Sequence, residues 1–148
     1  MYKKILVPLD GSKRSEMILP HAQDLASRYQ ATVIFLMALE YTFATGVEGA
    51  FIEFNEKDFN RKQDEVKSYL KKIADKFTKE KIEAETRIAS GPAVAAIIET
   101  ASKDNVDLIA MTSHGGGALS RVFYGSVASG VLNRVDRPLL VIRTRKSE

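Results

Sequence analysis

Short, largely apolar runs alternate along this chain with longer segments in which apolar residues recur at helical spacing. Residues 5–9, 31–39, 106–111 and 139–142 are nearly continuous apolar runs. Such runs are typical of strands buried on both faces of a parallel sheet. Residues 83–89 instead alternate polar and apolar side chains, which predicts a strand with one solvated face at a sheet edge.

Segments of helical periodicity connect these strands. They cover residues 12–29, 55–79, 91–105 and 126–134. Ser12 is the predicted N-cap of the first helix, and Pro20 predicts either a kink or a later start. Pro92 in the first turn and Asn105 at the end bound the third helix. Residues 40–54 have no clear period and are expected to form an irregular segment.

The alternation of strands and helices predicts one α/β domain, residues 1–148, with a parallel sheet between two helical layers. Sheets of this Rossmann-like kind bind ligands outside the carboxyl ends of their strands, where the winding direction reverses. If the fourth strand pairs beside the first, the reversal places residues 8–10 and 112–117 at the same crevice.

The candidate chemistry gathers in that crevice. Three consecutive glycines, 115–117, follow the fourth strand, and Gly125 and Ser126 precede the last helix. Glycine admits a ligand to the backbone, and the first N–H groups of a helix attract anions. Ser126 is the expected N-cap. A simple connecting loop is the alternative, because the run is neither a Walker A sequence nor a G-x-G-x-x-G turn. Asp10, at the end of the first strand, can accept hydrogen bonds from two ribose hydroxyls.

Composition narrows the classes of function. The 148 residues include no cysteine, so disulfides, zinc–thiolate sites and a thiol nucleophile are excluded. The net charge of +3 is scattered among acidic residues, so no nucleic-acid partner is expected. Apolar runs are far shorter than the roughly 20 residues of a membrane span, and a strand begins within the first residues instead of a signal peptide. We therefore expect a cytoplasmic protein without a membrane partner.

Four stretches carry a resemblance that spans the chain. They are the opening Lys-Lys-Ile-Leu-Val-Pro-Leu-Asp-Gly-Ser, the strand at 107–111, the run Ser-His-Gly followed by nine residues and Gly-Ser, and the closing Arg-Pro-Leu-Leu-Val-Ile. This pattern resembles the universal stress protein family, whose nucleotide-binding subgroup has G-x-x-G-x(9)-G-[ST]. Gly115, Gly125 and Ser126 match that motif, whereas Thr112 stands at its first glycine.

The resemblance implies an adenine-nucleotide α-hydrolase-like sandwich with strand order 3-2-1-4-5 that binds ATP, or ADP or AMP. It implies that Asp10 contacts the ribose, with or without a Mg²⁺ that bridges the phosphates, and that no dedicated metal site exists. The nucleotide site is expected to include Pro8, Leu9, Asp10, Ala38, Thr112, His114, Gly115, Gly116, Gly125, Ser126 and Val127. Thr112 either narrows this pocket and demands unfavourable backbone angles, or is harmless because the strand ends one residue later.

The expected role is that of a stress-response sensor or regulator rather than an efficient enzyme. Phosphoryl transfer needs a positioned base and cationic clamps, and the sequence offers Asp10 and Arg121 but no P-loop lysine. The alternative is a family member that binds no nucleotide and acts through dimerisation and protein partners. The resemblance implies a homodimer through the last strand, Leu139, Leu140, Val141 and Ile142. An adenylating ligase is a third reading, but residues 10–15 lack its Ser-Gly-Gly-x-Asp-Ser loop.

Overall fold

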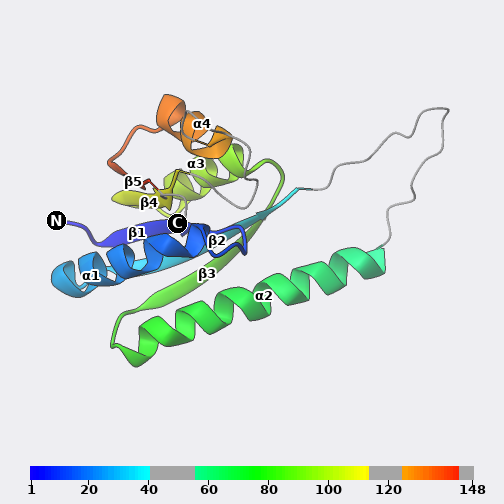
Figure 1. Cartoon of the computed structure of the whole chain (residues 1–148), viewed down its shortest axis with the longest axis horizontal. Helices are drawn as coiled ribbons and strands as arrows, with labels where there is room; N and C mark the ends of the chain where they lie inside the picture. The colour runs from blue at the N-terminus through cyan, green and yellow to red at the C-terminus, as the bar shows by residue number, and fades with distance from the viewer. Residues whose placement is uncertain (41–55, 114–124, 144–148) are drawn as a thin grey trace, which may run out of the picture.

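The apolar runs form one parallel sheet at the centre of the molecule. The computed structural model describes residues 1–40, 56–113 and 125–143. Its strands are β1 (Lys4–Pro8), β2 (Thr32–Leu39), β3 (Ala84–Ser90), β4 (Leu108–Thr112) and β5 (Leu139–Ile142), all parallel and ordered β3-β2-β1-β4-β5 (Figure 1). The predicted fold class and strand order are confirmed, and β3 lies at a sheet edge as its alternating pattern predicted.

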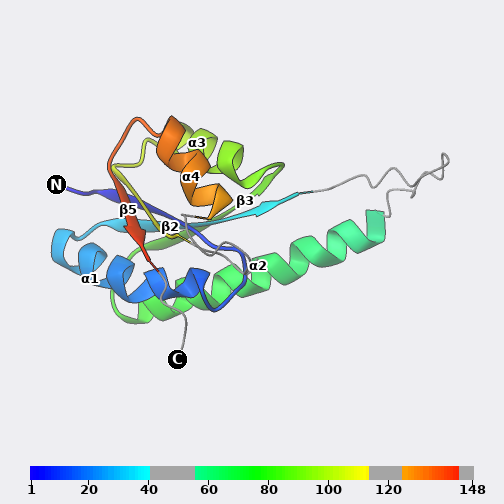
Figure 2. The ribbon, with the colours of Figure 1, turned by 45° about the horizontal axis from the view of Figure 1, so that its top comes forward.

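Helices cover both faces of the sheet. The short 3-10 helix η1 (Ser15–Ile18), α1 (Leu19–Tyr29) and α2 (Glu56–Lys79) lie on one face, and α3 (Ala93–Lys103) and α4 (Ser126–Arg134) lie on the other (Figures 1 and 2). Alternate strand residues point to alternate faces, so β1 gives Ile5 and Val7 to the first apolar core and Leu6 to the second. The fold is a three-layer sandwich with two hydrophobic cores.

Three predicted helix starts need correction. The first helix does not begin at Ser12, because η1 precedes α1. The later start predicted from Pro20 is confirmed: α1 begins at Leu19, and Pro20 lies in its first turn, where the missing N–H costs nothing. Pro92 is the N-cap of α3 rather than its first-turn residue. Ser126 is the first residue of α4, and the N-cap is Gly125, whose angles φ −53° and ψ 157° are extended.

Other boundaries follow the sequence closely. α3 ends at Lys103 with Asp104 as its C-cap, and Asn105, the predicted end, follows with a positive φ of 53°, a conformation that asparagine tolerates. The fourth strand is one residue longer at its carboxyl end than predicted, because Thr112 still pairs with Ile142 of β5. The irregular segment predicted at 40–54 lies, apart from residue 40, outside the described residues.

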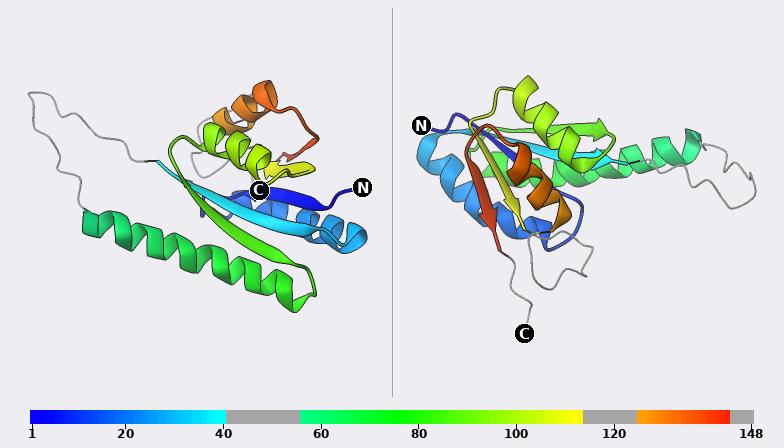
Figure 3. Two further views of the ribbon diagram at one scale, coloured as in Figure 1. Left: turned by 180° about the vertical axis from the view of Figure 1, so that it is seen from behind. Right: turned by 90° about the horizontal axis from the view of Figure 1, so that it is seen from above.

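The helix α2 is anchored to the sheet through only part of its length. Its buried residues are Val66, Leu70, Ile73, Ala74 and Phe77, and none of the ten residues before Val66 is buried. The amino-terminal half runs on past the sheet (Figures 1 and 3). Tyr69, within the anchored half, packs against the first core.

Candidate functional site

The strands β1 and β4 are neighbours at the centre of the sheet, and we refer to the region outside their carboxyl ends as the crevice. The two strands pair at Ile5 with Leu108 and at Leu6 with Ile109, and no later residues of these strands pair with each other. β1 remains paired with β2 as far as Pro8 with Leu36, and Leu9 still donates a hydrogen bond of 2.8 Å to the Leu36 carbonyl. β4 likewise continues beside β5. The winding direction reverses between β1 and β4, so this is the place at which such sheets bind ligands.

The fold brings the described candidate residues to the end of the sheet at which the strands have their carboxyl termini. Pro8, Leu9 and Asp10 end β1, Ala38 lies near the end of β2, Thr112 ends β4, and Gly125, Ser126 and Val127 begin α4. His114, Gly115 and Gly116, like Arg121, lie outside the described residues. The described part of the candidate site therefore comes from the carboxyl ends of β1, β2 and β4 and from the start of α4.

Asp10 is held by a compact turn on the β1 side of the crevice. One of its carboxylate oxygens, Oδ1, accepts hydrogen bonds from the backbone N–H and the hydroxyl of Ser12. The Ser12 hydroxyl oxygen accepts the N–H of Ser15 at 3.1 Å, and the Ser15 hydroxyl donates to the Ser12 carbonyl at 2.8 Å. Gly11, between them, has a φ of +87°, which a residue with a side chain rarely adopts. The exposed carboxylate is thus fixed in direction.

Thr112 fits its position without backbone strain. Its side chain is 5% exposed, it belongs to β4, and it is not among the described non-glycine residues with positive φ. The expectation that threonine would demand unfavourable angles is therefore wrong for this chain, because the strand continues through it. Thr112 lines the β4 side as a regular strand residue.

Two hydrogen bonds fix the chain on either side of the predicted glycine loop. Ser113, 2% exposed, donates its N–H to the Ile142 carbonyl at 2.9 Å, and its own carbonyl accepts the N–H of Gly125 at 2.6 Å. The start of α4 is thereby held against the end of β4. The first-turn N–H groups of α4, from Ser126 onward, have no partner within the helix and carry partial positive charge.

One residue of this region escaped the sequence analysis. Tyr69 belongs to the apolar stripe of α2, yet its hydroxyl oxygen is buried, close to the side chains of Glu16 and Ser15. Burial, and next the negative charge of Glu16, raises the pKa of this phenol; the charge of Asp10 acts in the same direction. The sequence signal that marks Tyr69 is a polar hydroxyl on an otherwise apolar helix face.

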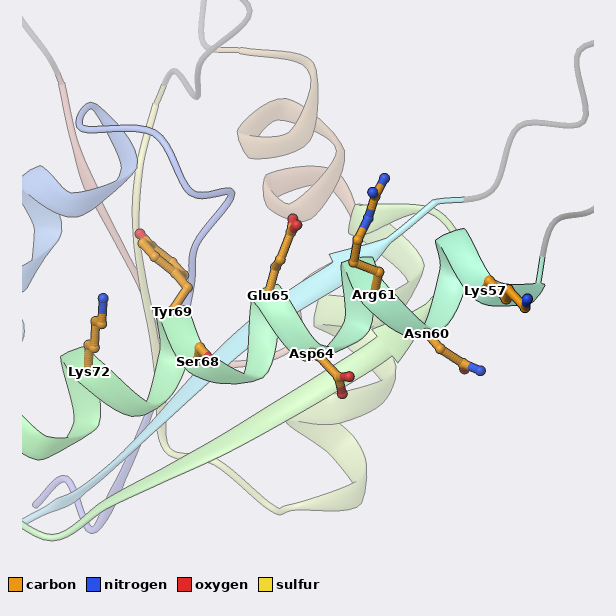
Figure 4. Close-up of a pocket in the computed structure, with 8 residues that line it drawn as sticks. All are labelled: Lys57, Asn60, Arg61, Asp64, Glu65, Ser68, Tyr69 and Lys72. Atoms are coloured by element: carbon orange, nitrogen blue, oxygen red, sulfur yellow. The ribbon is translucent and has the colours of Figure 1, made fainter.

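Tyr69 also borders a shallow groove of about 730 Å³ along α2. Its other lining residues are Lys57, Asn60, Arg61, Asp64, Glu65, Ser68 and Lys72 (Figure 4). All seven are exposed and their charges are mixed. They form a solvated face of α2.

Residues 1–40, 56–113 and 125–143 contain neither a candidate membrane span nor a candidate metal cluster. No helix there has the length and apolar character needed to cross a membrane. No group of three or more histidine, cysteine, aspartate or glutamate side chains there could hold a metal ion.

Comparison with known proteins decides the family. The profile of the Universal stress protein family matches residues 1–143. The chain belongs to the universal stress protein family. Among its relatives is Universal stress protein MJ0531 of Methanocaldococcus jannaschii, 31% identical over 150 residues that cover 100% of this chain and 86% of the relative.

Solved structures of universal stress proteins share the fold. The structure of MJ0577 from M. jannaschii superposes with a TM-score of 0.86 at 29% identity, covering 99% of each chain. A universal stress protein in complex with cAMP gives a TM-score of 0.69 at 21% identity and covers 97% of this chain and 98% of its own. The Archaeoglobus fulgidus protein in complex with dAMP gives 0.67 at 21% identity, with 95% and 98% covered. The last two establish likeness of fold, and their bound ligands are both adenine nucleotides.

Proposed function

We propose that this universal stress protein binds an adenine nucleotide, ATP or its products ADP and AMP, in the crevice between the carboxyl ends of β1 and β4. The observation that carries the proposal is the separation of these strands beyond Leu6 and Ile109, with a fixed carboxylate on one side and a helix N-terminus on the other. Two universal stress proteins of the same fold are complexes with cAMP and dAMP.

Each side of the crevice suits one part of a nucleotide. Asp10 projects an exposed carboxylate, and carboxylate oxygens accept the hydrogen bonds that two ribose hydroxyls donate. The apolar backbone region of Pro8, Leu9 and Ala38 offers a surface for the adenine ring. On the opposite side, the N–H groups of Ser126 and Val127 at the start of α4 suit phosphate oxygens. We assign Gly115 and Gly116 the same role from the motif.

A magnesium ion fits this arrangement only through the nucleotide. Mg²⁺ keeps several waters and binds through one or two carboxylates together with substrate phosphates. Asp10 supplies one carboxylate at the crevice, and no metal cluster exists among the described residues. Asp10 would therefore help to hold a Mg²⁺ that arrives with the phosphates.

We infer a sensor or regulator rather than an efficient enzyme. Fast phosphoryl transfer needs a base or water-positioning group and cationic clamps on the transferred phosphate. Of the described residues at the crevice, Asp10 alone is charged among the proposed contacts. Hydrolysis, if it takes place, is expected to be slow.

We further propose that the protein forms a homodimer through β5. The same dimer is expected under the alternative hypothesis, in which the protein binds no nucleotide and acts through protein partners. β5 is an edge strand whose four residues are all partly exposed. The carbonyls of Pro138 and Ile142 bond to β4, so the alternate residues Leu139 and Val141 direct their N–H and C=O groups to the open edge. Such an edge favours pairing with a second copy.

The test combines identification of bound nucleotide with titration. The purified protein is denatured, any released nucleotide is identified by mass spectrometry, and ATP with Mg²⁺ is titrated by calorimetry. We expect a co-purified adenine nucleotide or micromolar binding. Gly125→Val is expected to abolish binding while the fold persists, because the extended backbone at this position is open to other residues whereas a branched side chain blocks the anion.

Removal of the charge of Asp10 tests the β1 side of the proposed site. Asp10→Asn keeps the Oδ1 acceptor for the Ser12 turn but removes the carboxylate, so affinity should fall about tenfold or more, as for loss of a charge-assisted hydrogen bond. Asp24→Ala, an exposed carboxylate paired with Arg28 on α1, is the matched control and should bind normally. Absence of any binding up to millimolar ATP would reject nucleotide binding and leave the dimer edge as the functional surface.

A further inference from the structure

The hydroxyl of Ser12 makes the shortest hydrogen bond within the turn that follows β1. It donates to Asp10 Oδ1 at 2.5 Å, a length typical of a hydroxyl that donates to a carboxylate. The backbone N–H of Ser12 donates to the same oxygen at 2.9 Å. An aspartate closes a turn of this kind through the backbone N–H alone, so the hydroxyl is an additional contact that acts on the carboxylate.

Ser12 is itself held in place by Ser15. The Ser15 N–H donates to Ser12 Oγ at 3.1 Å, and the Ser15 hydroxyl donates to the Ser12 carbonyl at 2.8 Å. Ser15 is 5% exposed and begins η1, whose Ile18 is completely buried in the first core. The orientation of Ser12 is therefore set by residues that are anchored in the core, although Asp10 and Gly11 are exposed.

Both bonds from Ser12 act on one oxygen of the Asp10 carboxylate. A carboxylate oxygen has two lone-pair positions for hydrogen bonds, and the N–H and hydroxyl of Ser12 fill both positions of Oδ1. The last torsion of an aspartate side chain is otherwise broadly distributed, but rotation here would break both bonds. A sugar beside the end of β1 therefore meets Asp10 through Oδ2, in one fixed orientation.

We propose that Ser12 is a positioning residue that makes the nucleotide site selective for a ribose over a 2′-deoxyribose. With Oδ1 occupied, Oδ2 accepts both sugar hydroxyls, and this pair of bonds forms only while the carboxylate keeps its orientation. Ser12 touches no nucleotide atom and acts through Asp10. The inference rests on the proposed function, since it concerns the same site.

Selectivity between two sugars separates this role from a merely structural one. The wild-type protein should bind ATP about tenfold more tightly than 2′-deoxy-ATP, which lacks one hydrogen bond to the charged carboxylate. Ser12→Ala should weaken ATP binding about fivefold and leave 2′-deoxy-ATP little changed, so the preference falls to about twofold. Ser12→Thr keeps the hydroxyl and should keep the preference. A merely structural role would weaken both nucleotides equally.

The experiment measures the affinities for ATP and 2′-deoxy-ATP, each with Mg²⁺, by calorimetry. The proteins are the wild type, Ser12→Ala, Ser12→Thr, Asp10→Asn and the double variant with Ser12→Ala and Asp10→Asn. Ser102→Ala is the matched control, since Ser102 is exposed on α3, and it should match the wild type with both nucleotides. In the Asp10→Asn background, Ser12→Ala should not change the preference further, which would show that the two residues act as a pair.

The outcomes separate the inference from the proposed function. A preference for ATP that Ser12→Ala removes and Ser12→Thr keeps supports the inference. ATP binding with the same preference in Ser12→Ala overturns it and leaves nucleotide binding intact, as does a wild type that binds both nucleotides equally. A gain of ATP affinity in Ser12→Ala also overturns it, because Ser12 would then compete with the sugar for the carboxylate. A wild-type protein that binds no adenine nucleotide overturns the proposed function, and the inference falls with it.

Discussion

The side chain of Val94 in α3 occupies the space that any side chain at Gly130 in α4 would need. A Cβ atom at position 130 would lie 2.7 Å from Cγ2 and 3.2 Å from Cγ1 of Val94. Both helices cover the second core, and their close approach fixes where α4 lies against the sheet. This contact therefore helps to position the start of α4, where we propose that phosphate binds.

We predict that Gly130→Ala lowers the free energy of unfolding by about 1 to 2 kcal/mol, measured by urea denaturation. Overpacking costs about 1 to 3 kcal/mol and outweighs the gain of about 1 kcal/mol from replacing a helical glycine. The sign should reverse in a Val94→Ala background, where the space is free and alanine is the better helix former. A stabilising effect of Gly130→Ala in the wild-type background would contradict the close contact.

Asp107 joins the start of β1 to the segment before β4. Its Oδ2 atom accepts the backbone N–H groups of Lys3 at 2.8 Å and Lys4 at 2.9 Å, and these bonds hold the pKa of the carboxyl below its usual value. Asp107→Ala should lower stability at pH 7 by about 1 to 2 kcal/mol, a figure already reduced for solvent screening.

The pH dependence of this effect has a definite sign. Because the pKa in the folded state is depressed, the stabilisation is present above the unfolded value of about 4 and is lost as the pH falls through the folded value. Urea titrations from pH 7 to pH 3 should show the wild-type and Asp107→Ala curves converging at the acidic end. Asp75→Ala, whose carboxylate makes an exposed ion pair with Lys71, is the control. Curves that stay equally separated at low pH would show that the charge is not the cause.

The proposed dimer edge can be tested without breaking the sheet. The N–H of Val141 points away from β4, so Val141→Pro removes a group of the open edge while the bonds of Pro138 and Ile142 to β4 remain. We expect a monomer in analytical ultracentrifugation for Val141→Pro and a dimer for both the wild type and Val141→Ala, which keeps the N–H. A dimeric Val141→Pro variant would rule out this edge.

The order and type of the elements could be predicted because each strand and helix carries its own period. The details that failed depend on neighbours in space or on the conformation of one residue. Ser126 was expected at the N-cap, but the extended backbone of Gly125 takes that place. Tyr69 falls on the apolar stripe of α2, and nothing in the local sequence marks its hydroxyl as lying close to residues more than fifty positions earlier.

The candidate site was predictable to a similar degree. The strand order brings Asp10, Thr112 and Gly125 to one crevice, as the alternation and the resemblance together implied. The turn that orients Asp10 was missed, because Ser12 was interpreted as a helix cap rather than as a partner of that carboxylate. The bonds of Ser113 to Ile142 and Gly125 join distant parts of the chain and leave no local signature.

Two apolar cores, one on each face of the sheet, have a consequence for strand alignment. A one-residue slip moves every side chain of a strand to the opposite face, and here both faces are apolar, so hydrophobicity alone distinguishes poorly between the two alignments. Polar contacts favour one alignment over the other. Asp107 accepts hydrogen bonds from the N–H groups of Lys3 and Lys4. Arg137 Nη1 donates hydrogen bonds to the carbonyls of Ala101 at 2.6 Å and Val106 at 3.0 Å. These contacts fix the amino-terminal ends of the central strands, opposite the carboxyl ends at which we propose that a nucleotide binds.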